Sequence, residues 1–191
     1  MKKQEIRVLA FAGSLRQTSY NRGILRAAES LAPEGMRIEI FDIVDIPLYN
    51  EDVNQRGFPP AVAEFRRRIQ VADALLIATP EYNYSVPGVL KNAIDWASRP
   101  PQQPFQGKPV SLVGASAGMF GTTRAQHHLR QSFVFLDACV LARPEVMIPV
   151  AKERFDGDGN LIDTATRTIL AEHLIALLAW TRRLGQPEDA H

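Results

Sequence analysis

The sequence has a single cysteine, Cys139, so no disulfide can form within one chain. It contains no run of 18 or more apolar residues, which argues against a membrane-spanning helix, and its first residues are too poor in apolar side chains for a signal peptide. Neither sign of charge dominates, because 22 Lys and Arg oppose 21 Asp and Glu. No global field therefore favours nucleic acid or an anionic membrane. These absences predict a cytoplasmic protein without nucleic-acid or membrane partners.

The chain does have enough apolar sequence to build a core. Its 191 residues, of which 46% are hydrophobic and 23% charged, predict a single domain over residues 1–191. Strand-like segments alternate with helix-like segments, the strands being expected at residues 6–12, 36–43, 74–79, 110–115 and 139–150, and the helices at residues 20–31, 61–71, 89–97, 122–137 and 164–184. This alternation predicts an α/β fold with a doubly wound five-stranded parallel sheet.

Ligands of such sheets bind beside the carboxyl ends of the strands, where the strand order reverses. Three connections follow predicted strands at this edge, and we call them the first loop (residues 12–21), the second loop (residues 79–87) and the third loop (residues 115–121). Residues 45–60 are rich in Pro, Gly and Asn and are predicted to be a long surface loop. The chemistry of the protein is therefore expected at the three loops.

The first loop has the donors that an oxyanion needs. Ser14, Ser19 and Asn21 can donate hydrogen bonds, and Arg16 adds positive charge beside the amino-terminal end of a helix. The alternative is structural: Ser19 caps the helix, while Ser14 and Thr18 form a turn. The loop lacks the glycines of G-x-G-x-x-G and of G-x-x-x-x-G-K-[ST], which disfavours a dinucleotide-fold dehydrogenase or a P-loop ATPase. A phosphate monoester is the predicted ligand.

The second loop is bracketed by prolines, which stiffen its backbone. Its N–H groups and Asn83 can bind the polar edge of a planar heterocycle, and Tyr82 or Tyr84 can cover the ring. The alternative is a stiff turn whose tyrosines pack on the next helix. The glycines of the third loop let its backbone approach a flat ligand closely, or else they form a loose turn.

Together the three loops resemble those of a known family. The NAD(P)H-dependent FMN reductase family, which includes soluble chromate and quinone reductases, has FMN-binding loops similar to GSLRQTSYN, PEYNYSVPGVLKNAIDWASRP and GASAGMFGTTRAQHHLRQSFVFLDA. The resemblance runs from about Arg7 to Pro149. It is most specific in the stretch PEYN-x-S-x-P-G-x-L-K-N-x-[IL]-D-W. It implies a flavodoxin-like fold with strand order 2-1-3-4-5.

The resemblance also implies roles for particular residues. The FMN phosphate would be held by Ser14, Arg16, Ser19 and Asn21. The isoalloxazine would be lined by Pro80, Glu81, Tyr82 and Asn83, and its pocket completed by Ser116 and Gly118. No dedicated catalytic side chain is expected, because the flavin carries the chemistry.

The same resemblance implies NADPH or NADH as the electron donor and a small molecule as the electron acceptor. Quinones, azo dyes, flavins and chromate are the acceptors it suggests. It further implies a homodimer or homotetramer, in which one helix would lie near the partner subunit; that helix carries Lys91, Asn92, Asp95 and Trp96.

Two other classes of function compete with a reductase. A flavodoxin-like electron carrier would bind FMN and dock to protein partners, but such carriers are markedly acidic by family comparison, whereas this chain has a formal charge of +1. A domain that binds no flavin could have the same fold, because fold alone does not establish function. The absence of yellow colour, even after FMN is added, would point to that third class.

Some residues outside these loops have weaker functional interpretations. Arg124 is expected to face the nicotinamide phosphate, to contact Glu145 across a subunit interface, or to lie on a solvated helix face. His127 and His128 point about 100° apart on a helix, so a shared metal ion is disfavoured and no metal site is predicted. Asp156 opens a D-G-D-G-N segment that resembles a calcium loop but lacks its glycine and glutamate. A hairpin-like turn is predicted there.

Overall fold

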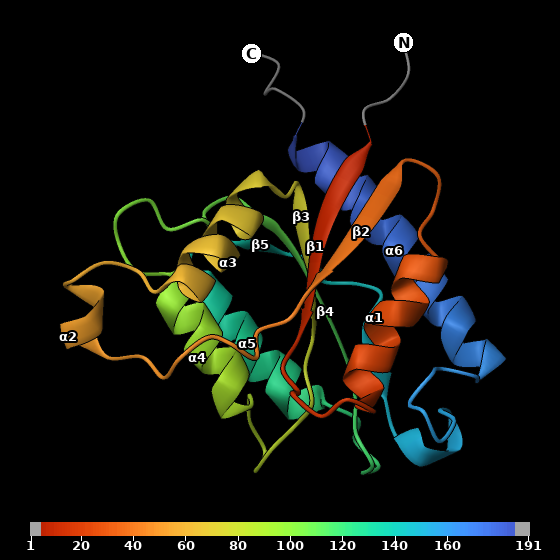
Figure 1. The fold of residues 1–191 in the computed structure, drawn as a ribbon. Coiled ribbons are helices and arrows are strands. Elements are labelled where there is room, and N and C mark those ends of the chain that lie inside the picture. The colour runs from red at the N-terminus through yellow and green to blue at the C-terminus, as the bar shows by residue number, and fades with distance from the viewer. Residues whose placement is uncertain (1–4, 186–191) are drawn as a thin grey trace.

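A computed structural model describes residues 5–185, so the domain predicted over residues 1–191 is described without residues 1–4 and 186–191. The strands are β1 (Ile6–Ala12), β2 (Met36–Phe41), β3 (Ala74–Ala78), β4 (Pro109–Ala115), β5 (Cys139–Val140) and β6 (Val146–Ile148). The helices are α1 (Tyr20–Ser30), α2 (Glu51–Asn54), α3 (Pro60–Val71), α4 (Gly88–Ala97), α5 (Thr123–Phe135) and α6 (Thr164–Leu184), with a 3₁₀ turn at Ala151–Glu153. Figure 1 shows their arrangement.

The strands form one parallel sheet in the order β2-β1-β3-β4-β5, which confirms the predicted topology. The fifth position differs from the prediction, because the single extended segment expected at residues 139–150 is divided. β5 pairs with the first half of β4 and β6 with its second half. Pro144 lies between them, and a proline has no N–H group with which to continue the ladder.

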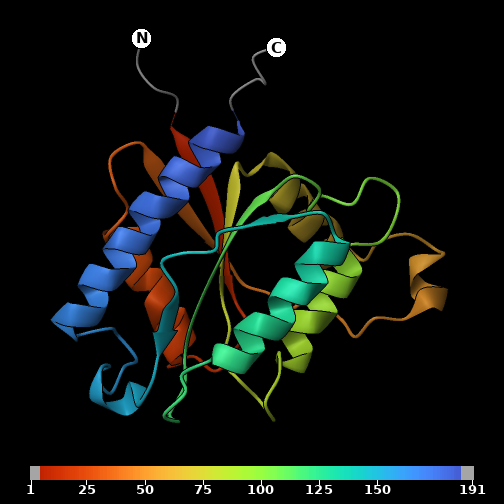
Figure 2. The same ribbon diagram turned by 180° about the vertical axis from the view of Figure 1, so that it is seen from behind.

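Helices cover both faces of the sheet, as Figures 1 and 2 show from opposite sides. Val8 and Ala10 of β1 point into the core shared with α1 and α6. Leu9 and Phe11 point into the core shared with α3, α4 and α5. β3 is buried along its whole length. A strand covered on both faces must be apolar throughout, and this is why the apolar runs of the sequence predicted the doubly wound sheet.

The connection over residues 45–60 is not structureless, since it contains the short helix α2. It also covers one side of α4. Trp96 Nε1 donates a hydrogen bond to the Pro47 carbonyl at 2.8 Å, and the Tyr49 ring packs against the Trp96 ring with centroids 4.8 Å apart. Asn92 accepts from the Tyr49 backbone N–H at 2.8 Å. Two of the four α4 residues expected near a partner subunit are therefore covered by their own chain.

The carboxyl ends of the strands, and with them the three loops, lie at one edge of the sheet, at the bottom of Figure 1. The described residues begin and end at the opposite edge. Within residues 5–185, no helix has both the length and the apolar character needed to cross a membrane.

Candidate active site at the carboxyl edge of the sheet

The fold brings the three predicted loops into direct contact. Gly13 at the end of β1 lies so close to the second loop that a Cβ there would be 3.4 Å from Pro80 Cδ. Asn21 reaches across to β4, where its Nδ2 donates to the Ala115 carbonyl and its Oδ1 accepts from the Ala115 N–H, both at 3.0 Å. Segments far apart in the sequence therefore form one site.

The first loop presents a run of backbone donors without protein partners. Within residues 5–185, the N–H groups of residues 14–18 donate to no protein acceptor. Ser14, the first residue of this run, is buried, whereas Arg16 lies at the surface. The Arg16 guanidinium lies 5.3 Å from the centroid of the Tyr20 ring and donates to Thr18 Oγ1 at 3.0 Å. These contacts hold a positive charge beside free N–H groups, an arrangement that suits an anion.

The helix-capping alternative for Ser19 is confirmed as a structural fact. Ser19 is buried, and its Oγ accepts from the Asn21 N–H at 3.2 Å at the start of α1. A hydroxyl that accepts one hydrogen bond still has its own proton to donate. Asn21, in contrast, bonds to Ala115 through both ends of its amide, so it fixes the position of the first loop against the third.

The second loop is a tight two-residue hairpin. Tyr82 and Ser85 exchange backbone hydrogen bonds of 3.1 and 3.0 Å, and the residues between them, Asn83 and Tyr84, have φ angles of 50° and 65°. Two consecutive positive φ angles are typical of a type I′ turn, which Asn favours and Tyr does not. Tyr82 and Tyr84 are 53% and 67% exposed, so the alternative in which both tyrosines pack on the next helix is wrong.

Glu81 joins the second loop to the start of α5. Its carboxylate accepts from the backbone N–H groups of Arg124 and Ala125 at 2.9 and 3.2 Å and from the Arg124 guanidinium at 2.8 Å. Partial burial raises the pKa of Glu81, but these hydrogen bonds outweigh it and bring the pKa below its ordinary value. A carboxylate from a distant loop thus caps a helix whose own Thr122 makes no side-chain cap.

Arg124 lies between two aromatic rings at the mouth of the site. Its guanidinium carbon is 3.7 Å from the Tyr84 ring centroid and 4.6 Å from that of Phe120. Within the chain Arg124 pairs with Glu81, and the contact with Glu145 across a subunit interface stays a prediction. The second loop is also held to α5 by a 3.0 Å hydrogen bond between Ser85 and His128. Arg124 therefore stabilises the second loop from within the chain.

The third loop is held by a segment that the sequence did not single out. Ser116 donates its N–H to the Ile148 carbonyl at 3.1 Å and accepts from the Ala151 N–H at 3.0 Å, and Val150 donates to the Gly118 carbonyl at 3.1 Å. The loop is therefore not a loose turn. Among the described residues, the N–H groups of residues 117–120 have no protein acceptor. Val150 has a φ angle of 47°, a backbone conformation that is energetically unfavourable for a β-branched residue. No feature of the sequence predicts this angle.

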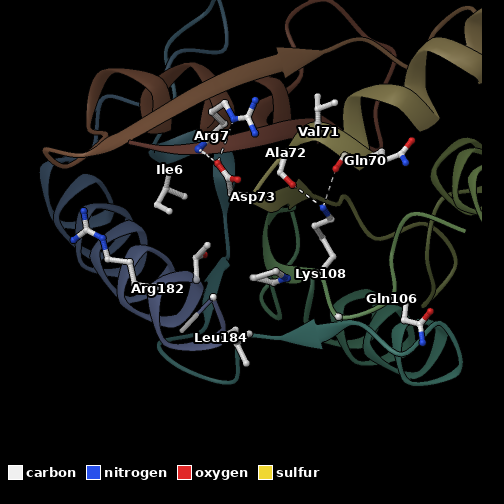
Figure 3. A pocket seen from close by; sticks show the side chains of 14 residues that line it. Ile6, Arg7, Gln70, Val71, Ala72, Asp73, Gln106, Lys108, Arg182 and Leu184 are labelled. Carbon is white, nitrogen blue, oxygen red and sulfur yellow. Dashed lines mark hydrogen bonds and ion pairs between the residues drawn. The ribbon is translucent and has the colours of Figure 1, made fainter. Parts of the chain in front are cut away.

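A large pocket among the described residues lies away from the three loops. A pocket of about 870 Å³ opens at the amino-terminal edge of the sheet (Figure 3). Two of its cationic groups already have protein partners. Arg7 pairs with Asp73, and Lys108 Nζ donates to the Ala72 carbonyl at 2.6 Å and to the Gln70 carbonyl at 3.3 Å. Within residues 5–185, no cluster of three or more His, Cys, Asp or Glu side chains could hold a metal ion.

Comparison with known proteins assigns the family. The model of NADPH-dependent FMN reductases matches residues 6–153. The chain belongs to this family. It is 61% identical to the NAD(P)H-dependent FMN reductase PA1204 of Pseudomonas aeruginosa over 94% of this chain and 97% of that relative. It is 45% identical to the quinone reductase of Escherichia coli K12 over 95% of this chain and 98% of that relative.

A solved structure supports the same assignment for this FMN reductase family member. FerB, a flavoenzyme NAD(P)H:(acceptor) oxidoreductase from Paracoccus denitrificans, superimposes with a TM-score of 0.85 at 34% identity, covering 95% of this chain and all of that one. The chain is thus an oxidoreductase with FMN as its cofactor and NAD(P)H as its electron donor.

The residues present fit FMN by their chemistry. A phosphate monoester needs several donors and a positive charge, and the first loop has five successive free N–H groups beside Arg16. The polar edge of an isoalloxazine needs donors at close range, and the free N–H groups of residues 117–120 belong to a loop rich in small residues. The two donor runs lie on loops that Asn21 ties together.

Proposed function

We propose that this FMN reductase reduces quinones and related small acceptors by two electrons at a flavin held between the three loops. The observation that carries the proposal is the set of free backbone N–H groups on the first and third loops. Donors without protein partners are expensive to bury and are suited to a bound ligand. The names of the relatives, an FMN reductase and a quinone reductase, support the reaction class.

In this proposal the first loop holds the FMN phosphate. The N–H groups of residues 14–18 and the hydroxyls of Ser14 and Ser19 donate to the phosphate oxygens, and Arg16 supplies the charge. The Asn21 side chain holds the first loop against the backbone of Ala115.

The second and third loops hold the ring in this proposal. Pro80, Glu81, Tyr82 and Asn83 line it on one side, and Ser116 and Gly118 on the other. When bound, FMN supplies the ability to accept a hydride and to pass on two electrons. The protein orients the ring and places backbone dipoles at its polar edge, which stabilises negative charge there.

The rim of the site favours a flat, apolar acceptor. Four large side chains are exposed around it: Tyr82 (53%), Tyr84 (67%), Met119 (75%) and Phe120 (65%). Exposed apolar side chains gathered beside polar groups mark ligand sites. We therefore propose quinones as the preferred electron acceptors, followed by azo dyes and free flavin. Chromate is a further acceptor that the family resemblance suggests. Arg124, the cation of the rim, is already paired with Glu81.

Steady-state kinetics test this function. Purified protein loaded with FMN is mixed with NADH or NADPH and with a quinone, free flavin, an azo dye or chromate. We expect the yellow colour to bleach with a reduced nicotinamide and to return with a quinone, and we expect a larger kcat/KM for quinone than for chromate. Bleaching that no small acceptor reverses would show an electron carrier, and a protein that stays colourless with FMN would contradict the flavin site.

Two further features stay predictions. We propose a cytoplasmic location, which the single cysteine supports, and a homodimer or homotetramer, which the family resemblance supports. Sedimentation velocity of the FMN-loaded protein measures the second, and a monomer over the micromolar range would contradict it.

A further inference from the structure

The D-G-D-G-N segment is a closed turn in which both oxygens of the Asp156 carboxylate accept hydrogen bonds from within the turn. Phe155 and Leu161 form an antiparallel bridge across its base, which confirms the predicted hairpin-like turn. One oxygen of the Asp156 carboxylate accepts from the N–H groups of Asp158 and Asn160 at 3.0 and 2.7 Å, and the other accepts from Asn160 Nδ2 at 3.0 Å. The turn is therefore rigid by itself, and we call residues 156–160 the brace.

The brace lies directly against the end of the first loop. A Cβ on Gly159 would be 2.6 Å from the Thr18 carbonyl oxygen, and the φ angle of Gly159 is +75°. The brace also lies against α1. A Cβ on Gly23 of α1 would be 1.9 Å from the Gly159 carbonyl oxygen. Two glycines on two separate segments thus allow backbone to meet backbone behind the loop.

Further contacts connect the brace to the charged end of the loop. Arg26 of α1 donates to the Gly159 carbonyl and to Asn160 Oδ1, both at 3.0 Å. Phe155, at the base of the brace, packs on Tyr20 with ring centroids 4.9 Å apart. Tyr20 in turn lies 5.3 Å from the Arg16 guanidinium. A continuous series of contacts therefore runs from the brace to Arg16.

We propose that the brace is a positioning element for the phosphate of FMN. It holds Thr18 and Tyr20 in place and, through them, the part of the first loop that carries Arg16 and the free N–H groups of residues 14–18. The inference rests on the proposed phosphate-binding role of the first loop. Donors held in place before binding lose less conformational freedom when the ligand arrives, and their affinity rises accordingly. Neither Gly159 nor Arg26 needs to touch the flavin.

The test compares FMN with riboflavin, which has the same ring and no phosphate. Gly159→Ala forces a Cβ against the Thr18 carbonyl, and Arg26→Ala releases the brace from α1. We expect each variant to raise the Kd of FMN by about tenfold, as the weakening of one or two charge-assisted hydrogen bonds would. The Kd of riboflavin should stay within about twofold of that of the unmodified protein. Fluorescence quenching of each flavin gives both constants.

Gly157→Ala is the matched control. Gly157 belongs to the same turn, but a Cβ there meets nothing within 4 Å, so both constants should be unchanged. Equal weakening of FMN and riboflavin, or no weakening in either variant, would overturn the inference. If Gly159→Ala does not fold, Arg26→Ala tests the inference by the same comparison of the Kd of FMN with the Kd of riboflavin. A failure of the underlying function looks different, because the unmodified protein would then bind FMN no more tightly than riboflavin.

Discussion

The two edges of the sheet differ in how their polar groups are partnered. At the amino-terminal edge there is a pocket of about 870 Å³, yet Lys108 and Arg7 in its wall bond to backbone carbonyls and to Asp73. At the carboxyl edge the described residues leave two runs of backbone N–H groups without protein partners. Two cations of the large pocket, Arg7 and Lys108, thus already have protein partners, whereas the described part of the loop edge has backbone donors without protein partners.

Under the proposed function, unpaired backbone donors mark the binding site and cavity volume does not. A hydrogen bond with a ligand adds little if the protein donor must first break an existing bond, because one bond is exchanged for another. Loop N–H groups without a protein partner exchange only bonds to water for bonds to the ligand, and no protein hydrogen bond is broken. Backbone segments also pack more closely around Gly114 at the carboxyl edge than around Gly185 at the opposite edge.

The largest expected effect comes from Gly114 at the carboxyl end of β4. A Cβ there would lie 2.2 Å from Thr122 Oγ1 and 2.3 Å from the Thr79 carbonyl oxygen, so Gly114→Ala must push the second and third loops apart. We expect a loss of about 3 kcal/mol in the free energy of unfolding, together with weaker FMN binding. Urea unfolding measures the first and flavin titration the second.

Gly185 at the opposite edge provides the control for this substitution. A Cβ there would be 3.4 Å from the Thr181 carbonyl oxygen, an ordinary contact. Gly185→Ala should change the free energy of unfolding by no more than about 0.5 kcal/mol. Equal losses in both variants would show that the two edges are packed alike.

The second prediction concerns two arginines, one at each edge. Arg16→Ala should raise the Kd of FMN by about 10- to 150-fold, since a hydrogen bond to a charged group contributes roughly 1.5–3 kcal/mol. Arg182 lies in the wall of the large pocket (Figure 3). Arg182→Ala should leave the Kd of FMN within about twofold of that of the unmodified protein. A greater loss from Arg182→Ala would move the phosphate site to the amino-terminal edge.

The sequence predicted the fold almost completely because its signals are local. The apolar run expected as a strand at residues 74–79 forms β3, which is buried along its whole length. The divided fifth strand was missed. Which half of residues 139–150 pairs with which half of β4 depends on contacts between distant residues.

The candidate site was predictable in place but not in detail. The loops follow from strand order, and the donors of the first loop follow from residue type. In contrast, the cap that Glu81 provides to α5 joins residues 43 positions apart, and Val150 adopts an angle that its residue type disfavours. Such features depend on tertiary contacts, so no local sequence pattern predicts them.

The smallest change in the free energy of unfolding is expected from replacing one carboxylate at each edge. The pH dependence of that free energy tests the role of the Glu81 charge. The side chain of Glu81 is only 9% exposed beside Arg124, whereas that of Asp73 is 28% exposed beside Arg7. Glu81→Gln should lower the free energy of unfolding at pH 7 by about 1–2 kcal/mol, and Asp73→Asn by less than about 1 kcal/mol, as is usual for exposed pairs.

The pKa of Glu81 lies below its ordinary value of 4.5 in the folded protein. The folded chain therefore holds the charged form more readily than the unfolded chain does. Its stabilisation is present above the unfolded pKa and is lost as the pH falls through the folded pKa. The stability curves of Glu81→Gln and the unmodified protein should accordingly converge in acid. Curves that stay parallel from pH 7 downward would mean that the charge of Glu81 does not stabilise the fold.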